Sequence, residues 1–106
     1  MVRYYFLVAS RDFLFYQEPI EEILRERLKH YKAINKVIDF AITTNLDFLD
    51  LPELKNIKRQ LIKPSVAIIS LNPKFINWLK LRIHYALKGN FVVDESNEYS
   101  DLFLID

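Results

Sequence analysis

The first apolar segment of the chain, residues 2–9, is hydrophobic at both sets of alternating positions. One set is Val2, Tyr4, Phe6 and Val8, and the other is Tyr5, Leu7 and Ala9. Because successive side chains of a strand point to opposite faces, a strand of this kind has both faces covered. We therefore predict a central strand, with helices on both sides or with helices on one side and a partner on the other.

A helical repeat follows over residues 19–34, after a connection over residues 10–18. Apolar residues recur at helical spacing, at Ile20, Ile23, Leu24, Leu28, Tyr31 and Ile34. Pro19 suits the first turn of a helix, where its missing N–H group is not needed. Acidic residues begin this segment and basic residues end it, which complements the helix dipole. We predict a helix over residues 19–34.

Two shorter elements are predicted in the middle of the chain. Residues 36–44 alternate as a strand, with Ile38, Phe40 and Ile42 on one face. Asp39 lies on the opposite face, which is unusual for an acidic residue among apolar neighbours. A short helix is predicted near residues 52–61.

The last part of the chain contains a buried strand and a longer helix. Residues 65–70 form a continuous apolar run, which suits a buried strand. Asn72 and Pro73 are typical of a helix start, and the pattern predicts a helix over residues 73–88. Gly89 then occupies the usual position of a left-handed C-cap.

The chain ends with a short fourth strand, predicted over residues 90–94, and an acidic tail over residues 95–106. Strands and helices therefore alternate along the chain, which indicates a layered α/β or α+β domain. A chain of 106 residues has room for one domain, which we place at residues 1–94.

Composition and charge exclude several classes of protein. Hydrophobic residues make up 51% of the chain and the net charge is +1, so a disordered chain is excluded and a nucleic-acid partner is disfavoured. The absence of cysteine excludes disulfides and thiol catalysis, and a single glycine excludes phosphate-binding loops. No apolar run is long enough to span a bilayer as a helix.

Neither a metal site nor a catalytic site is predicted. The two histidines, His30 and His84, follow Arg27 and Leu81 by three residues, so the Glu-x-x-His spacing of di-iron sites is absent. The serines lack the context of a nucleophile elbow. Asp39 is the strongest single acid, although pairing with Arg82 or a lysine, or exposure at a sheet edge, explains it better than catalysis.

The predicted helix at 73–88 is apolar beyond a single stripe. Trp78, Leu81 and Tyr85 lie away from the centre of its apolar face, next to Arg82. Trp, Tyr and Arg are enriched at the centres of protein interfaces, so this surface suits a protein partner. A core helix with extended basic side chains is an equally good interpretation.

An ordered set of short segments resembles one protein family over residues 3–93. The matching segments include Tyr4-Tyr5, Ala9-Ser10, Phe13-Leu14, Glu18-Pro19, Ile38-Asp39-Phe40, Pro52-Glu53-Leu54, Val66-Ala67-Ile68-Ile69-Ser70, Asn72, Phe75-Ile76, Trp78, Arg82, Tyr85, Gly89 and Phe91. The family is the small accessory subunit of the oxygen-dependent magnesium-protoporphyrin IX monomethyl ester cyclase, also called hypothetical chloroplast reading frame fifty-four.

The resemblance implies an α+β fold with a mainly antiparallel sheet of about four strands flanked by helices. It implies a non-catalytic role in chlorophyll biosynthesis, without a cofactor, in which the chain binds the membrane-associated di-iron cyclase subunit and reaches the membrane through it. Other chlorophyll-biosynthesis enzymes are further candidate partners. The implied location is a plastid, or the cytoplasm of a cyanobacterium near the thylakoid.

The residues assigned to the partner surface by this resemblance are Asp39, Phe40 and Arg82, extended by Trp78 and Tyr85. Asp39 and Phe40 point to opposite faces of a regular strand, so both reach one partner only at a strand end or a sheet edge. A tetrapyrrole-binding or substrate-delivery module is the alternative, with Trp78 and Tyr85 lining a pocket.

Overall fold

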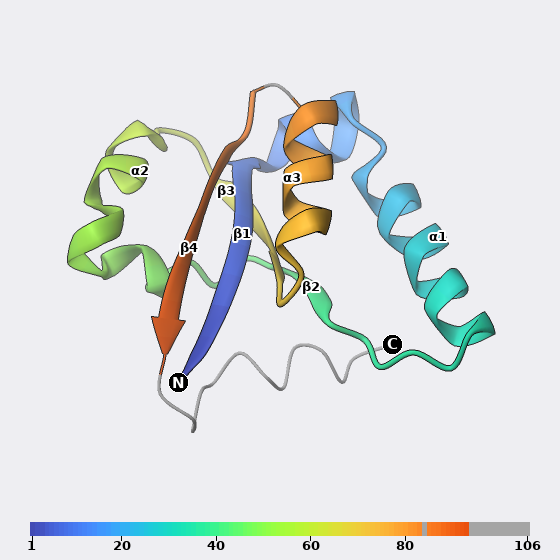
Figure 1. The fold of residues 1–106 in the computed structure, drawn as a ribbon. Coiled ribbons are helices and arrows are strands. Elements are labelled where there is room, and N and C mark those ends of the chain that lie inside the picture. The colour runs from blue at the N-terminus through green and yellow to red at the C-terminus, as the bar shows by residue number, and fades with distance from the viewer. Residues whose placement is uncertain (84, 94–106) are drawn as a thin grey trace.

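The sheet has four antiparallel strands in the order β2-β3-β1-β4 (Figure 1). The computed structural model describes residues 1–83 and 85–93. The strands are β1 (Val2–Ser10), β2 (Phe40–Thr43), β3 (Ser65–Ser70) and β4 (Leu87–Val93). In the register, Tyr5 lies opposite Ser70 on one side of β1 and opposite Asn90 on the other. The predicted α+β architecture with an antiparallel sheet is confirmed.

Helical segments cover both faces of this sheet (Figure 1). One face carries the π-helical turn η1 (Phe13–Gln17) and the helices α1 (Ile20–Ala33) and α3 (Pro73–Arg82). The other face carries the 3₁₀ turns η2 (Asp47–Asp50) and η3 (Pro52–Leu54) and the helix α2 (Lys55–Gln60). The molecule therefore has three layers, with the sheet in the middle.

Both faces of β1 are covered by helical segments, as its apolar residues at both sets of alternating positions predicted. Leu7 and Ala9 belong to the hydrophobic cluster beneath α1 and α3, whereas Tyr4, Phe6 and Val8 belong to the cluster beneath η2, η3 and α2. The predicted strand at 65–70 is likewise confirmed. The predicted helix at 19–34 is confirmed as α1, within one residue at each end.

The predicted helix at 73–88 is six residues too long. α3 ends at Arg82, because Ile83 takes an extended backbone conformation with φ −114° and ψ 92°. The last strand begins at Leu87, earlier than predicted, and Gly89 lies inside it rather than in a C-cap. A Cβ atom at Gly89 would lie 2.7 Å from Cζ of Phe6 in the neighbouring strand, so β4 needs a glycine there.

The predicted strand at 36–44 is shorter than expected. Asn35 has a left-handed backbone with φ 56°, and Lys36 N donates to Tyr31 O at 2.9 Å, so the chain turns sharply after α1. Pairing with β3 begins only at Phe40, which leaves Asp39 in the connection before β2.

The remaining predictions are confirmed in part or are not tested. The short helix near 52–61 consists of η3 followed by α2. The connection at 10–18 contains η1, which buries Leu14 in the cluster beneath α1 and α3. The predicted tail at 95–106 lies outside the described residues. Within the described residues, no helix has both the length and the apolar character needed to cross a membrane.

Candidate functional site

An arginine from α1 is enclosed by aromatic rings where α1, α3 and β2 meet. The guanidinium carbon of Arg27 lies 3.8 Å from the ring centroid of Phe75 on α3. The same carbon lies 5.0 Å from the ring centroid of Tyr31 and 5.8 Å from that of Phe40. Cation–π attraction is strongest where the cation is desolvated, so these rings hold the guanidinium in place.

The Tyr31 hydroxyl joins this arginine to Asp39. It accepts a hydrogen bond from Arg27 Nη2 at 2.9 Å and donates one to Asp39 Oδ1 at 2.8 Å. Arg27 and Tyr31 are one helical turn apart, which places them on one face of α1. The backbone carbonyl of Asp39 also accepts from Leu71 N at 3.0 Å, so Asp39 is fixed from two sides.

A second arginine extends the cluster towards solvent along α3. The Trp78 ring stacks on Phe75 with centroids 6.3 Å apart, and the guanidinium carbon of Arg82 lies 5.8 Å from the Trp78 centroid. Trp78 is 47% exposed and Arg82 is exposed. Arg27, Phe75, Trp78 and Arg82 thus form a series in which two stacked rings lie between two guanidinium groups, and we call it the arginine–aromatic ladder.

Four of the five residues assigned to the partner surface are connected through this ladder. Phe40 packs edge-on against Tyr31 and Phe75, with centroid distances of 5.4 Å and 5.6 Å, and is only 6% exposed. Phe40 therefore lies in the core and packs against the residues that form the surface. Among the described residues, no ion pair joins Asp39 to Arg82, and Tyr31 orients Asp39 instead.

Tyr85 belongs to a different part of the molecule. Its ring meets Phe13 of η1 edge-on, with centroids 5.8 Å apart, and it lines a groove of about 290 Å³ together with Ile62 and Leu87. Trp78 and Tyr85 therefore pack against different elements, rather than facing each other across a pocket.

Sequence reasoning did not identify Arg27, Tyr31 and Phe75 as functional residues. Tyr31 and Phe75 are part of ordinary apolar stripes, and Arg27 resembles any charged residue of a surface helix. The spacing of Arg27 and Tyr31 within one helical turn was the available signal, although nothing local linked them to Asp39 or Phe75.

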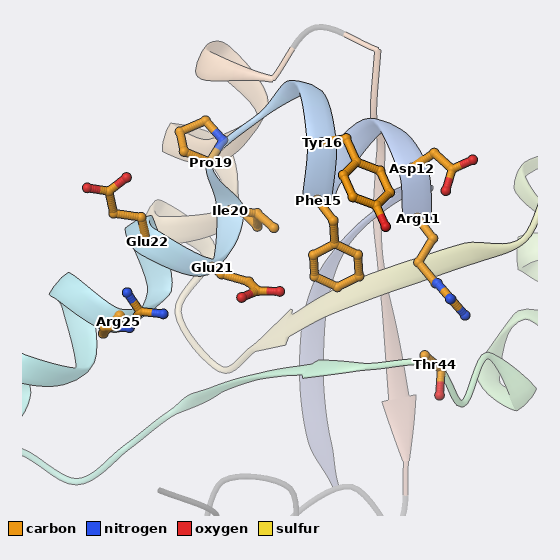
Figure 2. A pocket seen from close by; sticks show the side chains of 10 residues that line it. All are labelled: Arg11, Asp12, Phe15, Tyr16, Pro19, Ile20, Glu21, Glu22, Arg25 and Thr44. Atoms are coloured by element: carbon orange, nitrogen blue, oxygen red, sulfur yellow. The ribbon is translucent and has the colours of Figure 1, made fainter.

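A cavity of about 570 Å³ lies between η1, the start of α1 and the end of β2. Figure 2 shows Arg11 and Thr44 on one side of it, Glu22 and Arg25 on the other, and Phe15 between them. Its walls carry both signs of charge, so they select no single class of ligand. Within residues 1–83 and 85–93, no three or more His, Cys, Asp or Glu side chains are grouped so as to hold a metal ion.

The fold and the site define a single-domain α+β protein with an exposed arginine–aromatic surface. A sequence profile of the family described as Ycf54 protein matches residues 2–93, and the chain belongs to this family. The family predicted from the sequence is confirmed.

Relatives and a solved structure agree with this assignment. The chain is 53% identical over 91 residues to the uncharacterized protein ycf54 of the red alga Pyropia yezoensis, covering 86% of this chain and 82% of that protein. It is 33% identical over 97 residues to the chloroplastic protein YCF54 of Arabidopsis thaliana, covering 91% of this chain and 45% of that protein. The solved structure of the Ycf54 protein from the cyanobacterium Synechocystis superposes with a TM-score of 0.82 at 43% identity, covering 91% of each chain. These relatives confirm the expected location, a plastid or a cyanobacterial cell.

Proposed function

We propose that this protein is a non-catalytic accessory subunit of the magnesium-protoporphyrin IX monomethyl ester cyclase, and that it binds the di-iron catalytic subunit. The proposal starts from the cyclase family that the sequence resembles. The observation that carries it in the structure is the exposed end of the arginine–aromatic ladder, where Trp78 and Arg82 lie together on α3.

The side chains at this end of the ladder suit a protein partner. Trp and Arg are among the residues most enriched at interface hot spots, because each offers a large contact area together with hydrogen-bond donors. The stacking of Trp78 on Phe75, and of Phe75 on Arg27, fixes the tryptophan ring before binding. A surface ordered in advance loses less conformational entropy when a partner docks.

Asp39 takes part at the edge of the same surface. Its carboxylate is half-buried and is oriented by the Tyr31 hydroxyl. We assign it the role of a fixed acceptor for a donor on the catalytic subunit, with Phe40 supporting it from the core.

The proposal is tested by capture of the di-iron subunit from a detergent extract with the variants Trp78→Ala, Arg82→Ala and Asp39→Ala. Arg59→Ala, an exposed position on α2 across the sheet, is the matched control. We expect Trp78→Ala and Arg82→Ala to lower the affinity by at least about tenfold, which corresponds to hot-spot residues, and Arg59→Ala to leave it unchanged.

Two outcomes contradict the proposal. Variants that keep the thermal unfolding profile of the parent and still capture the subunit equally well exclude this surface as the docking site. A chain that captures no subunit but shifts the absorption spectrum of an added magnesium porphyrin favours the tetrapyrrole-binding alternative.

A further inference from the structure

Four strongly exposed apolar side chains gather at the end of the sheet where β1 ends. They are Tyr16, Ile62, Leu81 and Tyr85, which are between 78% and 89% exposed. We call them the strand-end rim. Tyr16 comes from η1 and Ile62 from the connection between α2 and β3, whereas Leu81 and Tyr85 come from the last turn of α3 and the residues just before β4.

The strand register explains why these segments meet. Ser10 at the end of β1 pairs with Ser65 at the start of β3, and Val8 pairs with Leu87 at the start of β4. The connections that carry the rim therefore lie at the same end of the molecule, at the top of the view in Figure 1. Ile62 and Tyr85 line one groove, so their contact surfaces are continuous.

Basic side chains accompany the rim. Arg11, Lys63 and Arg82 come from the same connections and are exposed. Residues 54–93, which supply three of the four rim segments, contain eight Lys and Arg and no Asp or Glu. Asp12 and Glu18 flank η1, and Arg11, Lys63 and Arg82 outnumber them, so the rim segments have a small net positive charge.

We propose that the strand-end rim rests directly on the surface of an anionic lipid bilayer. Tyrosine rings prefer the headgroup level of a bilayer, and Ile and Leu side chains gain free energy by entering the acyl region below it. Lysine and arginine side chains beside them attract anionic headgroups. This contact shares Arg82 with the proposed docking surface for a protein partner, but it needs neither Trp78 nor Asp39.

The shape of the rim favours a lipid surface over a protein segment. Its side chains project from separate segments, and the groove between Ile62 and Tyr85 is small, about 290 Å³. A fluid bilayer accepts separate projecting side chains without a complementary shape. The positive charge of the rim selects anionic over neutral lipid.

Flotation of the purified full chain with lipid vesicles tests the proposal. Neutral vesicles of phosphatidylcholine are compared with anionic vesicles that also contain phosphatidylglycerol. The apolar variant is Ile62→Ser combined with Leu81→Ser, and its control is Val37→Ser, an 83% exposed residue in the connection before β2, at the opposite end of the sheet. The charge variant is Lys63→Gln, and its control is Lys74→Gln near the start of α3.

We expect flotation with anionic vesicles only. The partition coefficient between water and anionic vesicles should fall about fivefold for Lys63→Gln and at least about tenfold for the double serine variant. Both control variants should partition like the parent chain. Because all five substituted positions are exposed, the variants should keep the thermal unfolding profile of the parent.

The proposal is overturned by three results: no flotation of the parent chain, equal flotation with neutral vesicles, or variants that float as well as the parent. If the parent does not float but the double serine variant loses capture of the di-iron subunit in detergent, the rim is a protein contact instead. The two proposals separate, because Trp78→Ala should float normally and the double serine variant should still capture the subunit.

Discussion

At the scale of single residues, Tyr31 holds the candidate site together. Its ring is 2% exposed, and its hydroxyl is bonded to Arg27 on one side and to Asp39 on the other. Both partners are charged, and hydrogen bonds to charged groups are stronger than those between neutral groups. The hydroxyl therefore contributes to stability as well as to the position of the Asp39 carboxylate.

Replacing Tyr31→Phe should lower the free energy of unfolding by about 2 kcal/mol, because two charged groups lose a partner in a partly buried site. Urea unfolding measures this change. Tyr16→Phe is the control, since its ring is exposed on η1. A Tyr31→Phe variant as stable as Tyr16→Phe would show that the hydroxyl contributes nothing.

Sequence reasoning reached only part of this site. Asp39 stood out because an acidic residue lay among apolar neighbours, and Trp78 and Arg82 because they lay off the apolar stripe of their helix. Arg27 could not be singled out, because its role depends on Phe75, which reaches it only after α1 and α3 have packed together.

At the scale of elements, the approach of β4 to β1 depends on Gly89. Gly89 pairs with Phe6, whose fully buried ring occupies the space that a side chain at position 89 would need. The glycine is therefore required by packing between strands, and its backbone is not in the left-handed region.

We expect Gly89→Ala to destabilise the protein by about 1–3 kcal/mol, the usual cost of overpacking a core. The loss should be smaller when Gly89→Ala is made in a Phe6→Leu background, where the ring is absent. Denaturant unfolding of the four proteins gives the coupling energy. Equal losses in both backgrounds would show that the Phe6 ring is not the obstacle.

The start of α3 depends on a side-chain cap. Asn72 Oδ1 accepts a hydrogen bond from Lys74 N at 3.0 Å, and Pro73 occupies the first helical position. Asn72→Ala should cost about 1 kcal/mol in thermal or urea unfolding, whereas Asn72→Asp keeps the acceptor and should cost less. If both substitutions have the same effect, the cap does not stabilise the helix.

The elements that were predicted well from the sequence are those in which the spacing of apolar residues along the chain fits only one type of secondary structure. β1, α1 and β3 each bury their apolar residues with the expected period. The helix predicted at 73–88 was too long because Leu87, at its end, fits a strand as well as it continues an apolar stripe. Pairing with β1, far away in sequence, selects the strand.

At the scale of the whole molecule, the two hydrophobic clusters share the same strands. β1 and β3 place alternate residues in each cluster, so neither helical layer can leave without exposing the sheet between them. The described residues should therefore unfold as one cooperative unit.

Trp78, the single tryptophan of the chain, makes this cooperativity measurable. Its fluorescence reports the layer of α3, whereas far-UV circular dichroism reports all helices and strands. The two urea transitions should have the same midpoint, because α3 cannot detach on its own. A fluorescence transition at lower urea than the dichroism transition would mean that α3 leaves first.

The order β2-β3-β1-β4 also has a consequence for how the chain reaches its fold. β1 is the first strand to be synthesised, yet its neighbours are the third and fourth strands, and Val2 pairs with Val93. Contacts between such distant residues make loop closure costly and folding slow. During synthesis, the apolar residues 2–9 stay unpaired until β3 and then β4 have been made, so the newly made chain needs protection from aggregation until β4 is complete.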